Sequence, residues 1–125
     1  MEKTRKKRIL IIEDDLDVLE TFIRNLKLSG YDVISAVDGM EGLKKIDEGE
    51  YDLVITDIVM PYVSGVGMVT ALKTKTPDMP VIAITGYGKE PEAAAMEKKA
   101  DIVLAKPIKM TVLIKHIADL LSEKV

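Results

Sequence analysis

The feature that most constrains the fold is an apolar run that ends on a carboxylate and then meets a proline. It occupies residues 51–61, with the sequence Tyr-Asp-Leu-Val-Ile-Thr-Asp-Ile-Val-Met-Pro. Consecutive β-branched and apolar residues, here Leu53 to Ile55, are typical of a strand buried on both faces of a parallel sheet. Asp57 then lies at the carboxyl end of that strand, the edge where open α/β sheets bind ligands. Because Asp is also favoured in turns, this stretch alone leaves a chemical and a turn-forming interpretation of Asp57 open.

Similar runs recur along the chain and alternate with segments whose apolar residues are spaced by three and four. Leu16 is predicted on the apolar, inward-facing side of the first helix, and Met40 on that of the second. We expect strands at residues 8–12, 31–36, 51–57, 80–85 and 101–105, and helices at 15–29, 38–49, 64–76, 91–98 and 110–121. Strict alternation of five strands with five helices predicts an α/β fold, a doubly wound parallel sheet covered on both faces.

The length of 125 residues fits one domain, residues 1–125, since no linker or repeat interrupts the alternation. Hydrophobic residues make up 47% of the chain, but no run approaches the ~20 apolar residues of a membrane span. There is no cysteine, which excludes disulfides and thiolate metal sites. With no secretory signal pattern either, we expect a soluble, cytoplasmic protein without a membrane partner.

The formal net charge of −3 is unevenly distributed. Residues 1–7 form a basic leader, whereas the rest of the chain is acidic. Such a leader could contact nucleic acid or an anionic surface. We favour a solvated tail, because an acidic domain repels polyanions over most of its surface.

Polar residues collect where the predicted strands end. They are Glu13, Asp14 and Asp15 after the first strand, Asp57 after the third, Thr85 after the fourth and Lys106 after the fifth. Acids gathered in one pocket repel each other unless a cation is present, and carboxylate oxygens suit Mg²⁺. A lysine adds a movable positive charge and a threonine a hydroxyl donor. The set predicts a phosphoryl-transfer site in which Asp57 is the nucleophile.

Each of these residues also has a structural explanation. The acids at 13–15 suit the negative first turn of a helix, Thr85 can simply end a strand, and Lys106 can be a surface lysine. Their occurrence together at one sheet edge favours the joint chemical interpretation.

Four segments carry a family resemblance. They are Ile9–Asp15, Asp52–Pro61 with Gly65, Ile84–Gly86 and Leu104–Pro107. In this order they resemble the signature segments of the response regulator receiver domain, and the resemblance covers nearly the whole chain. It implies a flavodoxin-like fold with strand order 2-1-3-4-5, which alternation alone does not fix.

The resemblance also implies roles for the residues at the strand ends. Asp57 is similar to the phosphoacceptor, and Glu13 and Asp14 to the acidic pair at the metal site. The Mg²⁺ ligands implied are Asp14, Asp57 and the backbone carbonyl of Val59. Thr85 and Lys106 resemble the residues that bind the phosphoryl oxygens after transfer, and the bond from Lys106 to Pro107 is expected to be cis.

Three features depart from the family pattern. Val103 stands where the family often has a Tyr or Phe that couples the site to the surface. Residues 99–101 lack the usual glycine after a fourth helix that is itself short. Tyr87 follows Thr85 by two positions, where a bulky side chain could overhang the pocket and slow access to it.

The function implied is a phosphorylation-activated signalling switch that catalyses only its own phosphoryl transfer and dephosphorylation. The expected partners are a sensor histidine kinase or phosphotransfer protein and a downstream protein bound by the fourth helix, fifth strand and fifth helix. We expect no DNA-binding or other output domain after Val125, and a monomer or a phosphorylation-dependent dimer.

Three other functions compete with the switch. A receiver-like module that is never phosphorylated is disfavoured, because the acids, Thr85 and Lys106 are all present. A phosphatase with an aspartyl nucleophile needs a second carboxylate where this chain has Val59. A flavodoxin-like electron carrier would be yellow, and a piece of a larger regulator is also compatible with the sequence.

His116 is interpreted as a solvated helix position rather than a phosphohistidine, since no acid or phosphate-binding group accompanies it.

Overall fold

The structure is a computed structural model that describes residues 5–58, 65–86 and 99–122. Its elements are β1 (Arg8–Ile12), α1 (Leu16–Leu28), β2 (Asp32–Ala36), α2 (Gly39–Glu48), β3 (Leu53–Asp57), α3 (Gly65–Lys75), β4 (Val81–Thr85), β5 (Ile102–Ala105) and α5 (Met110–Ser122). The predicted helix at 91–98 lies outside the described residues, as do Val59 and Tyr87.

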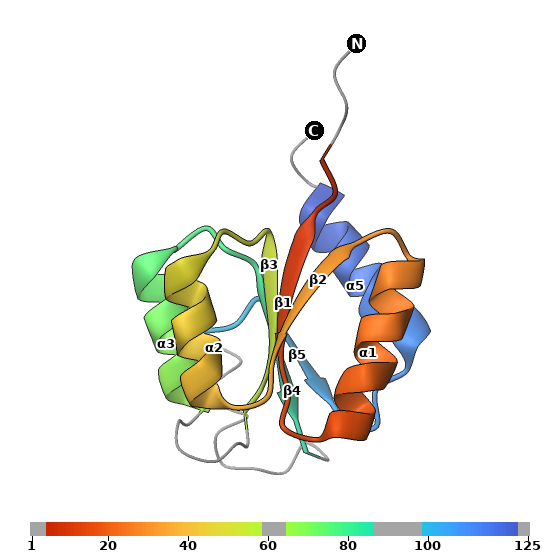
Figure 1. Ribbon diagram of the computed structural model, residues 1–125, viewed down its shortest axis with the longest axis horizontal. Helices are drawn as coiled ribbons and strands as arrows, with labels where there is room; N and C mark the ends of the chain where they lie inside the picture. Colours follow the sequence, from red (N-terminus) through yellow and green to blue (C-terminus); the bar gives the residue numbers. More distant parts are fainter. Residues whose placement is uncertain (1–4, 59–64, 87–98, 123–125) are drawn as a thin grey trace.

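All five strands belong to one parallel sheet with the order β2-β1-β3-β4-β5. The helices α1 and α5 cover one face, and α2 and α3 cover the other (Figure 1). The doubly wound fold and the strand order implied by the family resemblance are therefore confirmed. None of the helices in the described ranges has the length and apolar character that crossing a bilayer requires.

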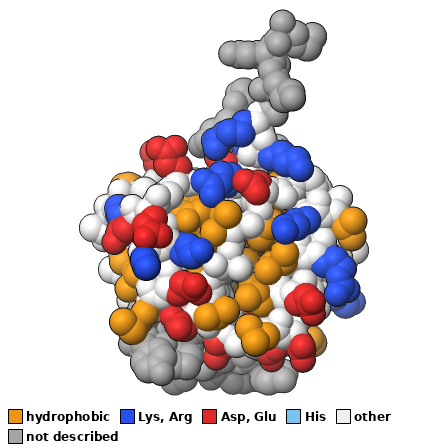
Figure 2. All heavy atoms as spheres, in the orientation of Figure 1, with side chains coloured by type: hydrophobic (Ala, Val, Ile, Leu, Met, Phe, Trp, Pro, Cys, Tyr) orange, Lys and Arg blue, Asp and Glu red, His pale blue; other side chains and the backbone are white. Residues whose placement is uncertain are grey.

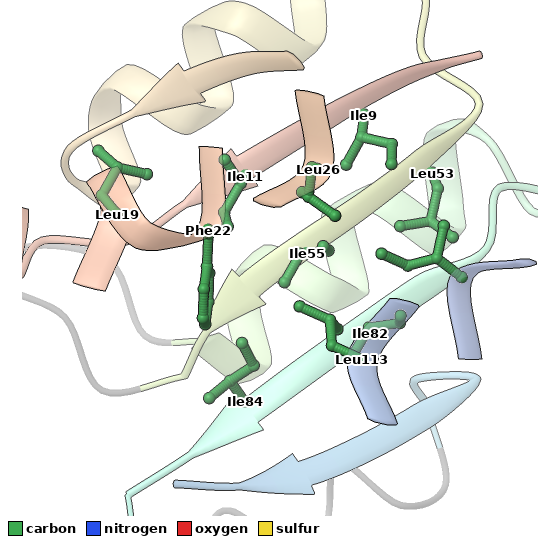
Figure 3. Close-up of a cluster of buried hydrophobic side chains, with 11 residues drawn as sticks. Ile9, Ile11, Leu19, Phe22, Leu26, Leu53, Ile55, Ile82, Ile84 and Leu113 are labelled. Carbon is green, nitrogen blue, oxygen red and sulfur yellow. The ribbon is translucent and has the colours of Figure 1, made fainter. Parts of the chain in front are cut away.

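Two apolar clusters fill the space between the sheet and its helices. Alternate residues of each strand point to opposite faces, so Ile9 and Ile11 join the cluster under α1 and α5 (Figure 3), whereas Leu10 and Ile12 join the cluster under α2 and α3. Every residue of β3 and β4 is buried, as their unbroken apolar runs predict. The central strands are thus fixed firmly enough to hold functional groups at their ends.

Local signals explain where the first two helices begin and end. Asp15 caps α1 by accepting the backbone N–H groups of Asp17 and Val18 at 3.0 and 3.2 Å. The helix ends before Gly30, whose φ of 99° requires a residue that tolerates the left-handed region. Asp38 caps α2 by accepting the backbone N–H of Glu41 at 2.8 Å.

Two apolar residues predicted on the inner helix stripes are exposed. Leu16 is 65% exposed and Met40 is 63% exposed. Each lies in the first turn of its helix, near the edge of the sheet, where little of the core lies beneath it. The inward stripe of α1 is made instead by Leu19, Phe22 and Leu26.

Candidate functional site

Four strand ends meet at the carboxyl edge of the sheet. Backbone hydrogen bonds fix their positions: Ile58 donates to the carbonyl of Ile84 at 3.0 Å, and Lys106 donates to the carbonyl of Thr85 at 2.8 Å. Glu13 donates to the carbonyl of Ala36 at 3.0 Å, which fixes the turn after β1. Residues from distant parts of the sequence are therefore held side by side at this edge.

The acids at this edge form a tight group. Carboxylate oxygens of Glu13, Asp14 and Asp57 all lie within 4.8 Å of one another. Glu13 and Asp57 are buried, with 1% and 3% of each residue exposed, and Asp14 is exposed. The third acid of the run, Asp15, is occupied as the cap of α1. The structure thus brings together the three acidic side chains predicted at the metal site.

Lys106 is the cation of this site. Its Nζ donates a hydrogen bond to Asp57 Oδ2 at 2.9 Å and lies 3.4 Å from Glu13 Oε1. Partial burial lowers the pKa of the Lys106 ammonium, but the hydrogen bond and charge of Asp57, together with Glu13, outweigh it and raise the pKa. Lys106 therefore stays protonated and offsets part of the carboxylate charge.

Glu13 is an unusual buried acid. Its Oε2 accepts the backbone N–H of Asp15 at 3.0 Å, whereas its Oε1 makes no hydrogen bond within the described residues. Burial raises the pKa of Glu13 to about 7, and the charge of Asp57 adds to the effect. The N–H of Asp15 and the charge of Lys106 lower the pKa but do not cancel the effect of burial.

The donor set fits a hard divalent cation. A buried carboxylate oxygen without a hydrogen bond costs free energy unless something else satisfies it. Lys106 Nζ lies 3.4 Å from that oxygen, and oxygens of the Glu13, Asp14 and Asp57 carboxylates lie within 4.8 Å of one another. Oxygen donors with excess negative charge suit Mg²⁺, which retains several water ligands of its own. The side chains of Glu13, Asp14 and Asp57 can therefore hold this ion.

Thr85 lies at the same edge, but its hydroxyl is directed elsewhere. Thr85 is 1% exposed, and its Oγ1 lies 3.5 Å from the carbonyl oxygen of Leu104 in β5. In the described contacts the hydroxyl is thus paired with the β5 backbone. The bond between Lys106 and Pro107 is cis, as the family resemblance implies. Val103, the residue that departs from the family pattern, is half-buried against the cluster under α2 and α3.

A cavity of about 860 Å³ opens from the acids along α1. Asp14, Asp57 and Lys106 line its polar end. Its apolar end is lined by Val18 and Phe22 of α1 together with Pro107, Ile108 and Met110, before and at the start of α5. Sequence reasoning missed this apolar end. The available signal was that Val18 and Phe22 lie one turn apart, directly after the acidic run.

A buried aspartate at the end of a central parallel strand, beside a lysine and an acidic pair, matches the site that the resemblance to receiver domains implies. The comparison with family models matches residues 9–118 to the response regulator receiver domain. This chain belongs to that family. Membership implies phosphorylation-activated signalling within a two-component system. Receiver domains bind Mg²⁺ in their acidic pocket.

Relatives and solved structures agree with the assignment. The transcriptional regulatory protein PrrA of Mycobacterium tuberculosis is 37% identical over 118 residues, which cover 94% of this chain and 51% of PrrA. A CheY-like receiver domain from Methanospirillum hungatei has a TM-score of 0.89 at 31% identity, covering 95% of this chain and 96% of that one. The response regulator TrrA of Thermotoga maritima, solved in complex with Mg²⁺ and BeF, has a TM-score of 0.83 at 32% identity, with coverages of 92% and 99%. The chain spans about half the length of the first curated relatives it matches.

Proposed function

We propose that Asp57 accepts a phosphoryl group from the phosphohistidine of a sensor kinase or phosphotransfer protein, in a Mg²⁺-dependent reaction. The observation that carries the proposal is the buried Asp57 carboxylate, hydrogen-bonded by Lys106 at 2.9 Å and grouped with Glu13 and Asp14. In the transfer, an Asp57 oxygen attacks phosphorus, the phosphorus–nitrogen bond breaks, and the imidazole leaves.

Glu13, Asp14 and Asp57 would hold the metal, with the carbonyl of Val59, outside the described residues, as a further proposed ligand. When bound, Mg²⁺ neutralises charge on the phosphoryl oxygens. The three carboxylates would otherwise repel an anionic donor. The TrrA complex with Mg²⁺ and BeF, at 32% identity, supports this assignment.

Lys106 and Thr85 would respond to the new phosphoryl group. Lys106 gives up its hydrogen bond to the Asp57 carboxylate and donates one to a phosphoryl oxygen instead. The Thr85 hydroxyl likewise leaves the Leu104 carbonyl and donates to a second phosphoryl oxygen. Driving a two-state equilibrium from about 1:99 to 99:1 needs roughly 5.5 kcal/mol of differential binding. Two or three hydrogen bonds to charged groups, at roughly 1.5–3 kcal/mol each, are of that order.

The output would be a protein contact on the face formed by the predicted fourth helix, β5 and α5. With Val103 in place of an aromatic residue, we infer that the signal reaches β5 through the Thr85 contact with Leu104. When the Thr85 hydroxyl leaves the Leu104 carbonyl, the β5 backbone next to Lys106 loses this hydrogen-bond donor. In this view the chain forms one receiver domain over residues 1–125, works in the cytoplasm, and catalyses only its own phosphorylation and dephosphorylation.

The direct test is incubation with acetyl phosphate and Mg²⁺ followed by intact-mass measurement. Wild type should gain one phosphoryl mass, and Asp57→Asn should gain none. The matched control is Asp47→Asn, which removes an exposed acid of α2 and should label like wild type. Asp14→Asn should lose most of the labelling, because it removes a proposed metal ligand. An unlabelled wild type would favour an interaction module that is never phosphorylated.

A further inference from the structure

The strand β2 forms an open edge of the sheet. It is the outermost strand in the order β2-β1-β3-β4-β5, and Figure 1 shows it running in front of the sheet between α1 and α2. Val33, Ile34 and Ser35 are half-buried, whereas β3 and β4 are buried throughout. An edge strand of this kind can pair with another strand.

The backbone of β2 presents alternate residues to that edge. Asp32 donates to the carbonyl of Lys7 at 2.9 Å, and the carbonyl of Ala36 accepts from Glu13 at 3.0 Å. In a parallel pair, alternate residues direct both backbone groups to the same neighbour, so Asp32, Ile34 and Ala36 face β1. The N–H and C=O groups of Val33 and Ser35 therefore face outward.

These outward groups match a second β2 strand in the antiparallel direction. With a two-fold axis at Ile34, Val33 of each copy lies opposite Ser35 of the other. Residues paired in this way exchange both of their backbone hydrogen bonds. The two sheets, each with five strands, would then join into one continuous sheet. Strand geometry alone thus makes this edge self-complementary.

The flank of α1 beside this edge carries charges that suit the same arrangement. Val18 and Phe22 line the cavity next to α5, so they mark the flank of α1 that faces away from β2. By helical spacing, Glu20 and Lys27 lie on the other flank, and both are exposed. The two-fold axis runs the α1 helices antiparallel, which places Glu20 of one copy near Lys27 of the other.

Charges are mixed at the amino edge of the sheet and acidic at the carboxyl edge. Arg5, Lys6 and Lys7 are exposed at the amino edge together with Asp32, Glu50 and Asp101, whereas Asp14 and Asp15 are exposed at the carboxyl edge. On the face shown in Figure 2, Lys and Arg side chains lie mainly in the upper half, and Asp and Glu side chains lie in both halves and along the lower border. An antiparallel copy brings the bases of residues 5–7 in one molecule toward the acidic end of the other.

We propose that a second copy of this chain docks antiparallel along β2 and forms a symmetric dimer. The occupant is a copy of the same chain because the backbone register and the α1 charges are self-complementary under one two-fold axis, which also brings residues 5–7 of one copy toward the acidic end of the other. The cavity at Asp57 lies between α1 and the start of α5, away from β2, so both phosphorylation sites stay open at opposite ends of the joined sheet.

The test is sedimentation equilibrium of the unphosphorylated protein at low ionic strength. We expect a monomer–dimer equilibrium that weakens as salt is added. Glu20→Lys and Lys27→Glu should each weaken dimerisation about tenfold, because each creates two like-charge contacts per dimer. The double variant restores opposite charges and should recover most of the affinity. A spacing of seven residues in one helix prevents direct pairing within a molecule, so recovery reports on contact between copies.

A second variant tests the strand itself. Ser35→Pro removes an outward N–H without breaking the bonds from Asp32 and Ala36 to β1, and should abolish the dimer. Urea unfolding and acetyl phosphate labelling of this variant check that its fold is kept. If wild type is monomeric at all concentrations, the proposal is wrong. A dimer whose affinity does not recover in the double variant would also overturn it, as would one unaffected by Ser35→Pro in a folded protein.

Discussion

At the scale of single residues, the site is a charge balance that the protein alone leaves incomplete. Two buried carboxylates, Glu13 and Asp57, share one ammonium group, that of Lys106. The exposed Asp14 adds a further acid within ligand distance. Protonation of Glu13 and binding of a cation are the two ways to complete this balance.

Glu13 should make stability depend on pH when metal is absent. Its pKa rises from an ordinary value of 4.5 to about 7 in the folded protein. Between these values the folded state binds more protons than the unfolded state, so stability falls as pH rises from 4.5 to 7. The total loss is up to about 3 kcal/mol. Glu13→Gln should remove this slope in urea unfolding with EDTA, whereas the exposed control Glu48→Gln should keep it. Parallel curves for wild type and Glu13→Gln would contradict the prediction.

Lys106→Met should make the protein depend more on metal. The change leaves Glu13 and Asp57 without their shared cation and should cost about 2 kcal/mol without Mg²⁺. Because Mg²⁺ replaces the missing charge, it should raise the melting temperature of the variant more than that of wild type. Thermal unfolding with and without Mg²⁺ measures this difference. The matched control is Lys109→Met, an exposed lysine of the same loop. An equal Mg²⁺ effect in wild type and Lys106→Met would count against the prediction.

At the scale of elements, α2 packs closely against the end of β1, the strand that leads into the acids of the site. Gly42 lies against Ile12, the residue directly before Glu13. A Cβ at position 42 would lie 2.7 Å from Ile12 Cδ1 and 3.1 Å from Cγ1. Ile12 is fully buried, so it cannot move away freely. The glycine thus allows the helix to approach the strand that positions the acids.

Gly42→Ala should therefore destabilise the protein, despite the better helix propensity of alanine. Overpacking costs about 1–3 kcal/mol, and the propensity gain is at most about 1 kcal/mol. Urea unfolding measures the difference. The control Lys44→Ala changes an exposed position of the same helix and should stay within about 0.5 kcal/mol of wild type. A Gly42→Ala protein as stable as wild type would show that α2 can shift at no cost.

The elements themselves were predictable because local signals agree with the fold. The buried runs of β3 and β4 lie where the sequence predicts them, and the helices capped by Asp15 and Asp38 begin where the predicted helices begin. Strand order was not predictable from alternation, since alternation is the same for several sheet orders, and it came from the family resemblance. The exposure of Leu16 was missed because helical periodicity does not show where the sheet ends.

The sequence predicts which residues meet at the site, but not how each of their side chains is oriented there. Residues at the carboxyl ends of parallel strands must share an edge, which brought Asp57 and Lys106 together. Which acid of residues 13–15 points inward depends on the turn after β1, so the burial of Glu13 could not be predicted. The contact of Thr85 with Leu104 depends on a side-chain rotation that no sequence pattern specifies.

At the scale of the whole molecule, the metal site joins parts of the chain that are far apart in sequence. Glu13 and Asp14 follow β1, whereas Asp57 ends β3. A ligand that binds only the folded arrangement must stabilise the entire protein. Mg²⁺ should therefore act on global unfolding as well as on phosphorylation.

At free Mg²⁺ ten times its Kd, the gain in unfolding free energy should be about 1.4 kcal/mol. Calorimetry or thermal unfolding across a Mg²⁺ titration measures it. Asp14→Asn should lose most of this gain at the same Mg²⁺ concentration. The control Asp17→Asn changes an exposed acid of α1 outside the proposed ligand set and should respond to Mg²⁺ as wild type does. Equal responses of Asp14→Asn and wild type would remove Asp14 from the ligand set.

The most direct test of the central claim is to locate the phosphoryl group on the chain. After phosphorylation with acetyl phosphate and Mg²⁺, borohydride reduces an aspartyl phosphate to homoserine, which peptide mass spectrometry places at one residue. The result predicted here is homoserine at position 57 and at no other acid. Homoserine at Asp14 or any other aspartate would contradict it, as would 5-hydroxynorvaline, the product of a reduced glutamyl phosphate, at Glu13. Neither product in a protein that carries the phosphoryl mass would also contradict it.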